Sequence, residues 1–277
     1  MTTPSTANPV SATAYWTLAS RAEDASRERP IADDRFAQRF VNDDARAVAK
    51  RLASLKKPYS SFPVRHRIID DLLAAELSVD PELRVVLIGS GFDSRPFRLA
   101  GGRWLEVDEP DLLAYKESRL PSSGSPQELE RVPIRFGEES LESVLAPYAT
   151  LARVAVVLEG VLGYLSDDER RRLLSTLIRV FPNHVVFCDL VTRTFLKRHA
   201  RNVVRLLREL GAEFSASDDT PDALFHELGY ETREQISVVL RGAALRAPGA
   251  PPRWVVRRLR SLRSGYCVWA FEHPGTG

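Results

Sequence analysis

Residues 83–91, Leu-Arg-Val-Val-Leu-Ile-Gly-Ser-Gly, are the stretch of sequence that decides the fold. The mostly apolar run lacks the alternation of a half-exposed strand, and it is typical of a parallel strand buried on both faces. Gly89 and Gly91 follow at once, and glycine lets the backbone turn sharply and lets a ligand approach closely. Ligands of open α/β sheets bind at the carboxyl ends of strands, so this turn is a candidate binding site.

Further segments on either side have the composition of strands, and helical patterns separate several of them. The clearest helical spacing covers residues 167–181, where Ser166 and Glu169 form the pattern of a capping box. Alternating strands and helices predict a parallel sheet with helices on both faces. The expected parallel strands cover residues 103–107, 131–134, 153–158 and 184–188, and residues 235–240 and 266–271 fit an antiparallel pair at the end of that sheet.

The residues before the sheet are expected to be helical. Apolar spacing predicts one helix from about Asp34 to about Leu55 and a second near Val64 to Leu77. We therefore expect residues 1–80 to form an N-terminal helical cover, or lid, over a core of residues 81–277. The two parts form one integrated domain, a size that 277 residues permit.

Composition and charge exclude several classes of protein. The chain has 39 basic and 37 acidic residues, whereas dedicated nucleic-acid binders have a strong basic surplus. It has no run of 18 apolar residues that could cross a membrane, and no apolar core of a secretory signal near its start. Cys188 and Cys267 are far apart, without metal-ligand spacing. We expect a cytoplasmic protein with no metal, no membrane and no nucleic acid as partner.

Two carboxylates stand where strands are expected to end. Asp108 follows the strand at residues 103–107, and a carboxylate there can accept hydrogen bonds from both hydroxyls of a ribose. Glu106 lies on the same side, but only Asp108 is past the end of the strand. Glu159 follows the strand at residues 153–158, where an acid must be solvated by a cleft or paired. A cationic ligand and an arginine are both possible partners for it.

The glycine pattern is incomplete for a dinucleotide. The third glycine of the dinucleotide fingerprint would fall at residue 94, which is Ser94. The residues after Gly91 also make a poor helix start for holding a pyrophosphate. A nicotinamide-dependent oxidoreductase is therefore less favoured than a protein whose ligand lacks phosphates.

Several motifs, in this order and spacing, resemble the leucine carboxyl methyltransferase family, in particular its bacterial small-molecule O-methyltransferase branch. The resemblance covers roughly residues 11–272. It implies S-adenosyl-L-methionine as cofactor and the Rossmann-like class I methyltransferase fold, an α/β architecture with a seven-stranded, mostly parallel sheet and a reversed last strand. The motifs lie at residues 11–23, 31–37, 65–71, 87–95, 106–110, 116 and 159–165.

The resemblance also implies roles for cofactor-binding residues. Arg65 would hold the carboxylate of the methionine part, which suits the fork of a guanidinium. Gly89 and Gly91 would line the cofactor, Asp108 would bind its ribose, and Glu159 would lie near its amino group.

One position departs from the family's pattern. The family has an aspartate that contacts the adenine amine where this chain has Arg135, and a guanidinium has no acceptor for that amine. Such an arginine either turns to solvent or pairs with Glu138 or Glu139. Phe136 can still pack on the adenine. Arg21 and Tyr164 are candidate contacts for the methyl acceptor.

Methyl transfer to a carboxylate is expected to need no general acid or base from the protein. Methyl transfer is an in-line displacement, which an enzyme promotes mainly by positioning. A carboxylate acceptor is already anionic at neutral pH, whereas a phenol would benefit from a base. His66, His199 and His226 are scattered, and each is interpreted as a surface or structural residue.

We therefore expect an S-adenosyl-L-methionine-dependent O-methyltransferase that converts a carboxylate of a small molecule, natural product or peptide into its methyl ester. The alternative is a non-catalytic relative with an altered cofactor pocket. The arginine-rich residues 253–263 are interpreted as a solvated helix face, with an anionic-substrate patch as the alternative.

Overall fold

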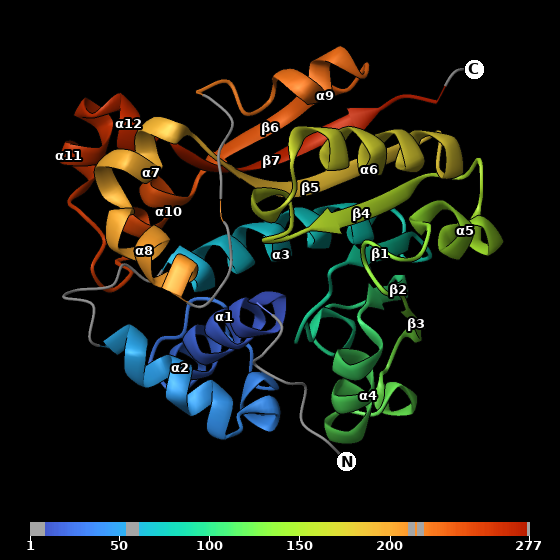
Figure 1. Ribbon diagram of the computed structural model, residues 1–277, viewed down its shortest axis with the longest axis horizontal. Coiled ribbons are helices and arrows are strands. Elements are labelled where there is room, and N and C mark those ends of the chain that lie inside the picture. The colour runs from blue at the N-terminus through green and yellow to red at the C-terminus, as the bar shows by residue number, and fades with distance from the viewer. Residues whose placement is uncertain (1–8, 54–60, 210–213, 215–218, 276–277) are drawn as a thin grey trace.

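Seven strands form one sheet in the computed structural model, which describes residues 9–53, 61–209, 214 and 219–275 (Figure 1). The strand order is β3-β2-β1-β4-β5-β7-β6. All neighbours pair in parallel except β7, which is antiparallel to both β5 and β6. The seven-stranded, mostly parallel sheet with a reversed last strand is therefore confirmed. The strands are β1 (Arg84–Ile88), β2 (Arg103–Asp108), β3 (Glu128–Pro133), β4 (Val154–Leu158), β5 (His184–Val191), β6 (Glu231–Ser237) and β7 (Tyr266–His273).

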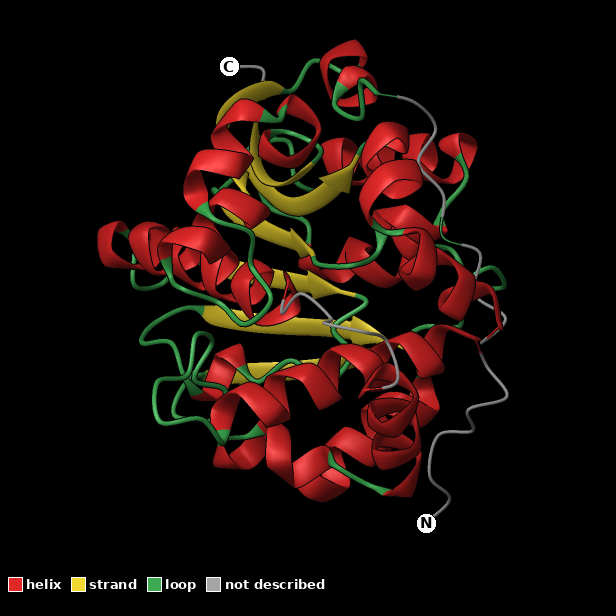
Figure 2. Cartoon of the chain, turned by 90° about the vertical axis from the view of Figure 1, so that its left-hand side faces the viewer, coloured by secondary structure: helices red, strands yellow, loops and turns green. Residues whose placement is uncertain are grey.

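Helices cover both faces of the sheet, as Figure 2 shows from the side. On one face α3 (Ser61–Val79) and α10 (Val238–Ala244) pack against Val85 and Leu87. On the other face α6 (Asp167–Val180) packs against Val86 and Ile88. Successive residues of a strand point to opposite faces, which explains why the run in β1 is apolar without interruption.

The remaining helices flank this core. The capping box at the start of α6 is confirmed, because Ser166 accepts from the Glu169 amide and the Glu169 carboxylate accepts from the Ser166 amide. No helix in the described ranges is both long enough and apolar enough to span a membrane. The other helices are α4 (Pro110–Arg119), α5 (Leu141–Leu145), α7 (Arg193–His199), α8 (Arg201–Glu209), α9 (Ala223–Glu227), α11 (Arg253–Arg258) and α12 (Arg260–Arg263).

The N-terminal part begins with α1 (Pro9–Ala25), a helix that the apolar spacing did not predict. Its Tyr15 ring lies 5.1 Å from the ring of Phe92, in the turn after β1, and Phe40 packs on the same ring at 5.5 Å. These contacts fix α1 against the carboxyl ends of the strands.

The prediction of one helix from Asp34 to Leu55 was wrong. The segment contains a 3-10 turn at Ala37–Phe40, an extended Val41, and then α2 (Asp43–Ala53). Asn42 separates the two, because its side chain accepts from the Ala45 amide and caps α2 while it donates to the Tyr15 hydroxyl. Both pieces bury apolar residues against α1, so their spacing mimics one helix. The predicted end at Leu55 lies outside the described residues.

A second boundary also differs from the prediction. The strand expected at residues 235–240 is β6, which ends at Ser237, and α10 starts at Val238. The Ser237 hydroxyl accepts from the Leu240 amide and so caps α10. The apolar residues 238–240 face the core from a helix rather than from a strand.

Candidate functional site

The candidate site lies where the strand order changes direction. β1 is paired with β2 on one side and with β4 on the other, all in parallel. The turns after these three strands therefore meet at one edge of the sheet, the usual position of ligands in open α/β folds. This topology brings Gly89, Asp108 and Glu159 together, although they are distant in the sequence.

A single cavity of about 2190 Å³ opens at this edge. Ligand pockets usually measure about 300–1,000 Å³, so the space suffices for two ligands side by side. The structure brings together every residue proposed from the sequence for cofactor and acceptor, although their roles stay predictions. The predicted residues that line the cavity are Arg21, Arg65, Gly89, Gly91, Asp108, Phe136, Glu159 and Tyr164.

The glycine turn after β1 is built for close approach. Gly89 has a φ of 65° and Gly91 a φ of 51°, both in the left-handed region that favours glycine. A Cβ atom on Gly89 would lie 2.8 Å from Cγ2 of Val161. The turn leads only into a three-residue 3-10 helix, Arg95–Phe97, so no long helix offers its N-terminus to a pyrophosphate.

Asp108 closes this turn from β2. Its carboxylate accepts from the Gly91 amide at 2.5 Å and from the Glu109 amide at 2.7 Å. Burial raises the pKa of Asp108 to about 6, against the opposing effect of these two bonds. Each oxygen keeps a further lone pair for a ligand. Glu106 is instead bonded to Lys116 at 2.7 Å and Arg131 at 2.9 Å, which leaves Asp108 as the acid at the turn.

Glu159 and Arg65 are partners of each other. The Arg65 Nε donates to Glu159 at 3.0 Å, and its Nη1 donates to Asp189 at 2.9 Å and to the Tyr266 hydroxyl at 3.3 Å. Burial opposes the charge of Arg65, yet Asp189, Tyr266 and Glu159 raise the pKa of its guanidinium well above the usual value. A cationic ligand and an arginine were both possible partners for Glu159, and in the described residues the partner is an arginine.

Arg65 keeps one nitrogen for a ligand. Within the described ranges its Nη2 makes no hydrogen bond, and it lies against Gly160, where a Cβ would be 3.2 Å away. Gly160 has a φ of 70° and its amide donates to Asp189 at 2.6 Å. The glycine therefore leaves room for the guanidinium and holds the carboxylate that orients it.

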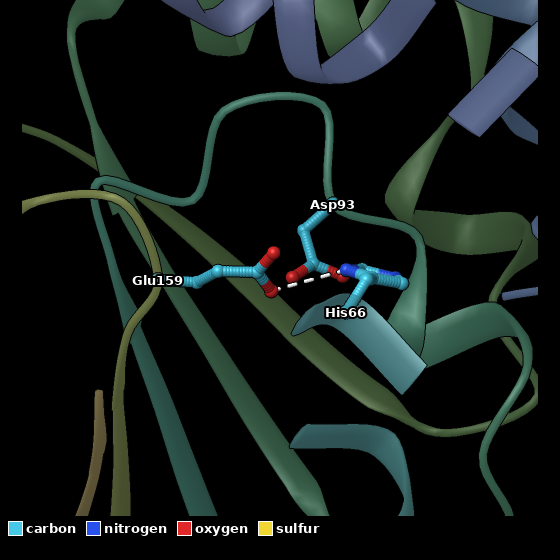
Figure 3. Close-up of side chains that lie close together, drawn as sticks. All are labelled: His66, Asp93 and Glu159. Carbon is cyan, nitrogen blue, oxygen red and sulfur yellow. Dashed lines mark hydrogen bonds and ion pairs between the residues drawn. The ribbon is translucent and has the colours of Figure 1, made fainter. Parts of the chain in front are cut away.

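His66, Asp93 and Glu159 converge within reach of one another (Figure 3), an arrangement that can hold a metal ion. Arg95 takes that position. Its guanidinium pairs with Asp93, lies 2.7 Å from Glu159, and lies 2.9 Å from Nδ1 of His66. The Arg95 guanidinium therefore supplies the positive charge between these acids, and it would repel a metal ion placed there.

His66 was interpreted as a surface or structural residue, and its burial excludes the surface position. Glu159 lies 3.0 Å from Nδ1, and Nη2 of Arg98 lies 2.7 Å from Nε2. Because a guanidinium only donates, Nε2 accepts from Arg98, while Nδ1 faces both the Glu159 carboxylate and Nη2 of Arg95. Burial would raise the pKa of Glu159, but Arg95, His66 and Arg65 together hold it well below the usual range.

Arg21 connects α1 to this network. Its guanidinium donates to Asp34 at 2.7 Å and to the carbonyl of Phe92 at 3.0 Å. Asp34 is fully buried and also accepts from the Ser94 hydroxyl at 2.5 Å. Arg21 thus fixes the cover to the turn after β1, in addition to lining the cavity.

Tyr164 and Phe136 lie at two other walls of the cavity. Burial raises the pKa of Tyr164 to about 12, against a hydrogen bond with Thr13, and its ring meets Phe214 edge-on at 5.2 Å. Phe136 is 40% exposed, and its amide donates to Glu109 at 3.1 Å.

Arg135, next to Phe136, is exposed and does not line the cavity. Its backbone amide donates to Glu139 at 2.7 Å. Among the residues that the structure describes, the Arg135 side chain forms no ion pair with Glu138 or Glu139. Of the two orientations expected for it, toward solvent or toward these acids, the structure has the first.

Sequence reasoning missed three residues of the site. Arg95 stands inside the motif at residues 87–95 but was given no role in the site. Asp189 and Tyr266 stand near the cavity end of β5 and β7. An acid near the carboxyl end of β5 is the same signal that singled out Asp108 and Glu159. The partners of Arg95 are up to 64 residues away in sequence, so its burial leaves no local signal.

The fold and the site at its topological switch define the class I methyltransferase architecture. A crystal structure of a "putative methyltransferase" from Thermobifida fusca superposes with a TM-score of 0.62 at 14% identity, over 96% of this chain and 94% of that one. Residues 14–178 match the sequence profile of the leucine carboxyl methyltransferase family, and the chain belongs to that family.

Two relatives differ in how much of this chain they match. A "putative S-adenosyl-L-methionine-dependent methyltransferase" of Parafrankia sp. (strain EAN1pec) is 35% identical over 62% of this chain, and the match spans 59% of the relative's length. The tetracenomycin polyketide synthesis O-methyltransferase TcmP of Streptomyces glaucescens is 28% identical over 89% of both chains. The chain therefore spans about three fifths of the first relative and most of the second.

Proposed function

We propose that this protein is an S-adenosyl-L-methionine-dependent O-methyltransferase that converts a carboxylate of a small molecule or natural product into its methyl ester. The family and the named activities of its relatives support the cofactor and the transfer of a methyl group. TcmP supports an oxygen acceptor in natural-product chemistry. The observation that carries the proposal is the cavity at the turns after β1, β2 and β4.

The residues at these turns fit the cofactor. Gly89 and Gly91 line the cavity, and Asp108 offers further lone pairs at the position proposed for a ribose. Nη2 of Arg65 is available for the methionine carboxylate, and the buried Ser90 hydroxyl has no partner among the described residues. When bound, the cofactor supplies an electrophilic methyl group on a sulfonium.

The remaining space in the cavity suits a sizeable acceptor. Four aromatic side chains line the cavity: Trp16, Phe62, Tyr164 and Phe214. Residues of the helices α1, α3 and α8 also line it. Aromatic rings bind flat apolar bodies and exclude water from the reacting groups. We propose that residues 1–80 act as the cover of this space and residues 81–277 as the core that holds the cofactor.

The acids and bases of the cavity favour an acceptor that needs no deprotonation. Asp189 and Glu159 are held by arginine, and His66 is fixed between Glu159 and Arg98. Tyr164, whose pKa is about 12, stays protonated and can donate a hydrogen bond to an acceptor oxygen. A carboxylate is anionic at neutral pH and meets these conditions.

A hydroxyl acceptor is the second candidate, because His199 also lines the cavity. Burial lowers the pKa of His199, so its ring is neutral at pH 7, and Nε2 lies 2.9 Å from the Ser261 hydroxyl. A neutral imidazole at the rim can serve as a base for a phenol. The variant His199→Gln separates the two candidates, since it should slow transfer to a phenol and leave transfer to a carboxylate unchanged.

The experiment combines titration with product chemistry. S-adenosylhomocysteine should bind in a calorimeter, and methyl-labelled S-adenosyl-L-methionine should transfer its label to members of a panel of aromatic carboxylic acids. A methyl ester releases labelled methanol in mild alkali, whereas a methyl ether does not. Alkali-stable label would assign a hydroxyl acceptor. Failure to bind either form of the cofactor, in a folded protein, would support the alternative of a non-catalytic binding protein.

A further inference from the structure

Basic charge is concentrated in two segments of this nearly neutral chain. Of its 39 basic and 37 acidic residues, 12 basic and one acidic residue lie in residues 193–209 and 242–263. The rest of the chain therefore has 27 basic and 36 acidic residues. A segregation of this size produces a surface potential that acts on charged partners, even though the whole chain is almost neutral.

The fold places the two segments side by side. α7 and α8 form the first, and α11 and α12 lie in the second. These helices gather at one end of the molecule with α10 (Figure 1). The Thr192 amide donates to the Gly265 carbonyl at 2.8 Å, and Nε2 of His199 lies 2.9 Å from the Ser261 hydroxyl. We call the exposed cations of these helices the basic face.

The cations of the basic face have no acidic partner among the described residues. Elsewhere exposed arginines form ion pairs, as Arg103 does with Glu128 and Arg179 with Glu142. In the parts of the chain that the structure describes, none of the basic face's cations forms an ion pair within 4.0 Å. These exposed cations are Arg193, Lys197, Arg198, Arg201, Arg205 and Arg208 on α7 and α8, and Arg253, Arg257, Arg258, Arg260 and Arg263 on α11 and α12.

Asp219, an acid that borders the face, is already held by hydrogen bonds. Asp219 is close enough to Arg193 and Lys197 for their charges to lower its pKa, after the larger effect of its hydrogen bonds from Thr194. Its two oxygens are bonded to the Thr194 amide and hydroxyl, at 2.8 and 2.7 Å. Mutual repulsion within the face therefore persists in the folded chain.

Apolar side chains stand among these cations. Trp254 is 64% exposed and Leu259 46% exposed, and Leu245 is exposed beside them. The guanidinium of Arg258 lies 5.8 Å from the centre of the Trp254 ring. Tryptophan and arginine are enriched at the centres of protein interfaces, whereas lysine is depleted there, and the face has a single lysine.

The basic face also borders the cavity. Arg198, His199 and Arg201 line the cavity and belong to α7 and α8, which carry half of the face. A partner on the face would therefore lie beside the entrance through which an acceptor arrives.

We infer that the basic face is a docking surface for an acidic polypeptide, which binds beside the mouth of the cavity. Charge complementarity supplies the attraction, and Trp254 with Leu259 supplies the apolar contact that a purely ionic surface lacks. A partner in this place can present a methyl acceptor to the cavity, and only that last step rests on the proposed function.

The test measures binding of fluorescent poly-L-glutamate at low ionic strength, without cofactor. The face variant replaces Arg253, Arg257, Arg260 and Arg263 with glutamine, and the control variant replaces Arg29, Arg35, Arg39 and Arg119, which are exposed outside the cavity. Both variants lose four charges. The face variant should weaken binding at least tenfold, the control less than twofold, and added salt should weaken the binding of the unmodified protein. Trp254→Ala should weaken it at least threefold with no change in charge.

Equal losses in the two four-residue variants would overturn the inference, because binding would then follow net charge. Tighter binding to phosphatidylglycerol vesicles or to duplex DNA, at the same ionic strength, would assign the face to a membrane or to nucleic acid and would also overturn it. S-adenosylhomocysteine should bind all variants alike. Its failure to bind the unmodified protein would contradict the proposed function and would leave the result for the basic face intact.

Discussion

Nε of Arg65 donates to Oε1 of Glu159 over 3.0 Å, although 94 positions of sequence separate the two residues. One comes from the first turns of α3 and the other follows β4. The pair joins the helix that covers one face of the sheet to the cavity at the strand ends. Its charges are already balanced, so a zwitterionic ligand can exchange its carboxylate and ammonium for these partners without leaving a buried charge alone.

Arg65→Lys should weaken the binding of S-adenosylhomocysteine at least tenfold. A lysine keeps the charge that Glu159 and Asp189 need, but its single nitrogen cannot occupy the three separate positions of Nε, Nη1 and Nη2. Hydrogen bonds to charged groups contribute ~1.5–3 kcal/mol each. Calorimetric titration measures the loss. Arg67→Lys, two residues from Arg65 and paired with the half-exposed Asp71, is the matched control. Equal affinity in the two variants would remove Arg65 from the cofactor site.

Cofactor binding should weaken as the pH falls through about 6, where Asp108 takes up a proton. The protonated acid loses the charge that accepts from ribose hydroxyls. The pKa of Asp108 is raised above the reference value of 3.8, so its contribution to stability is largest below that value and is lost as the pH rises through 6. Ligand-free stability and affinity therefore change in opposite directions in this window. Titration from pH 5 to 8 measures the affinity, which in Asp108→Asn should lose this pH dependence; an unchanged profile in that variant would contradict the assignment.

Gly160→Ala should destabilise the protein by more than the usual cost of a left-handed alanine, about 1–2 kcal/mol. The new Cβ would stand 3.2 Å from Nη2 of Arg65 in a buried site, so the guanidinium must shift. Gly137→Ala is the control, since Gly137 has a φ of 88° and open space at its Cβ position. Denaturant unfolding compares the two variants. Equal losses would mean that only the backbone angle matters at residue 160.

Asp34→Asn should lower the free energy of unfolding by roughly 3 kcal/mol or more, because it leaves the buried Arg21 without its charged partner. Asp43→Asn removes an exposed pair with Arg46 and should cost about 1 kcal/mol or less. Thermal and denaturant unfolding of both variants provide the comparison. A loss at Asp34 no larger than that at Asp43 would show that the cover does not depend on this ion pair.

The sheet and the cavity residues were predictable because they depend on local signals. An apolar run, a glycine turn and an acid at a strand end are each visible within ten residues, and parallel topology then brings strand ends together. The α/β class and the reversed last strand follow from this reasoning and from the family resemblance, and both are confirmed. Every expected strand is present, but β3 covers Glu128–Pro133 rather than 131–134, and β6 covers Glu231–Ser237 rather than 235–240.

The partners of the charged residues were not predictable in the same way. Arg95 is fully buried among Asp93, Glu159 and Asp70, and nothing near residue 95 distinguishes it from the many exposed arginines. The break at Asn42 was missed for a related reason. Its capping bond to Ala45 is local, but the apolar spacing on both sides reflects packing against α1, a tertiary contact that mimics a continuous helix.

The charged network at the cavity also determines which contacts can form early and which form late during synthesis of the chain. Its members extend from Arg21 in α1 to Tyr266 at the start of β7, so a ribosome must synthesise almost the whole sequence before the last bond to Arg65 can form. During synthesis α3 and the first parallel strands can associate while Arg65 still lacks Asp189 and Tyr266, which come from β5 and β7. Domains rich in such distant contacts fold slowly. The charged network around Arg65 is therefore completed last, after the strands that form the core of the sheet have been synthesised.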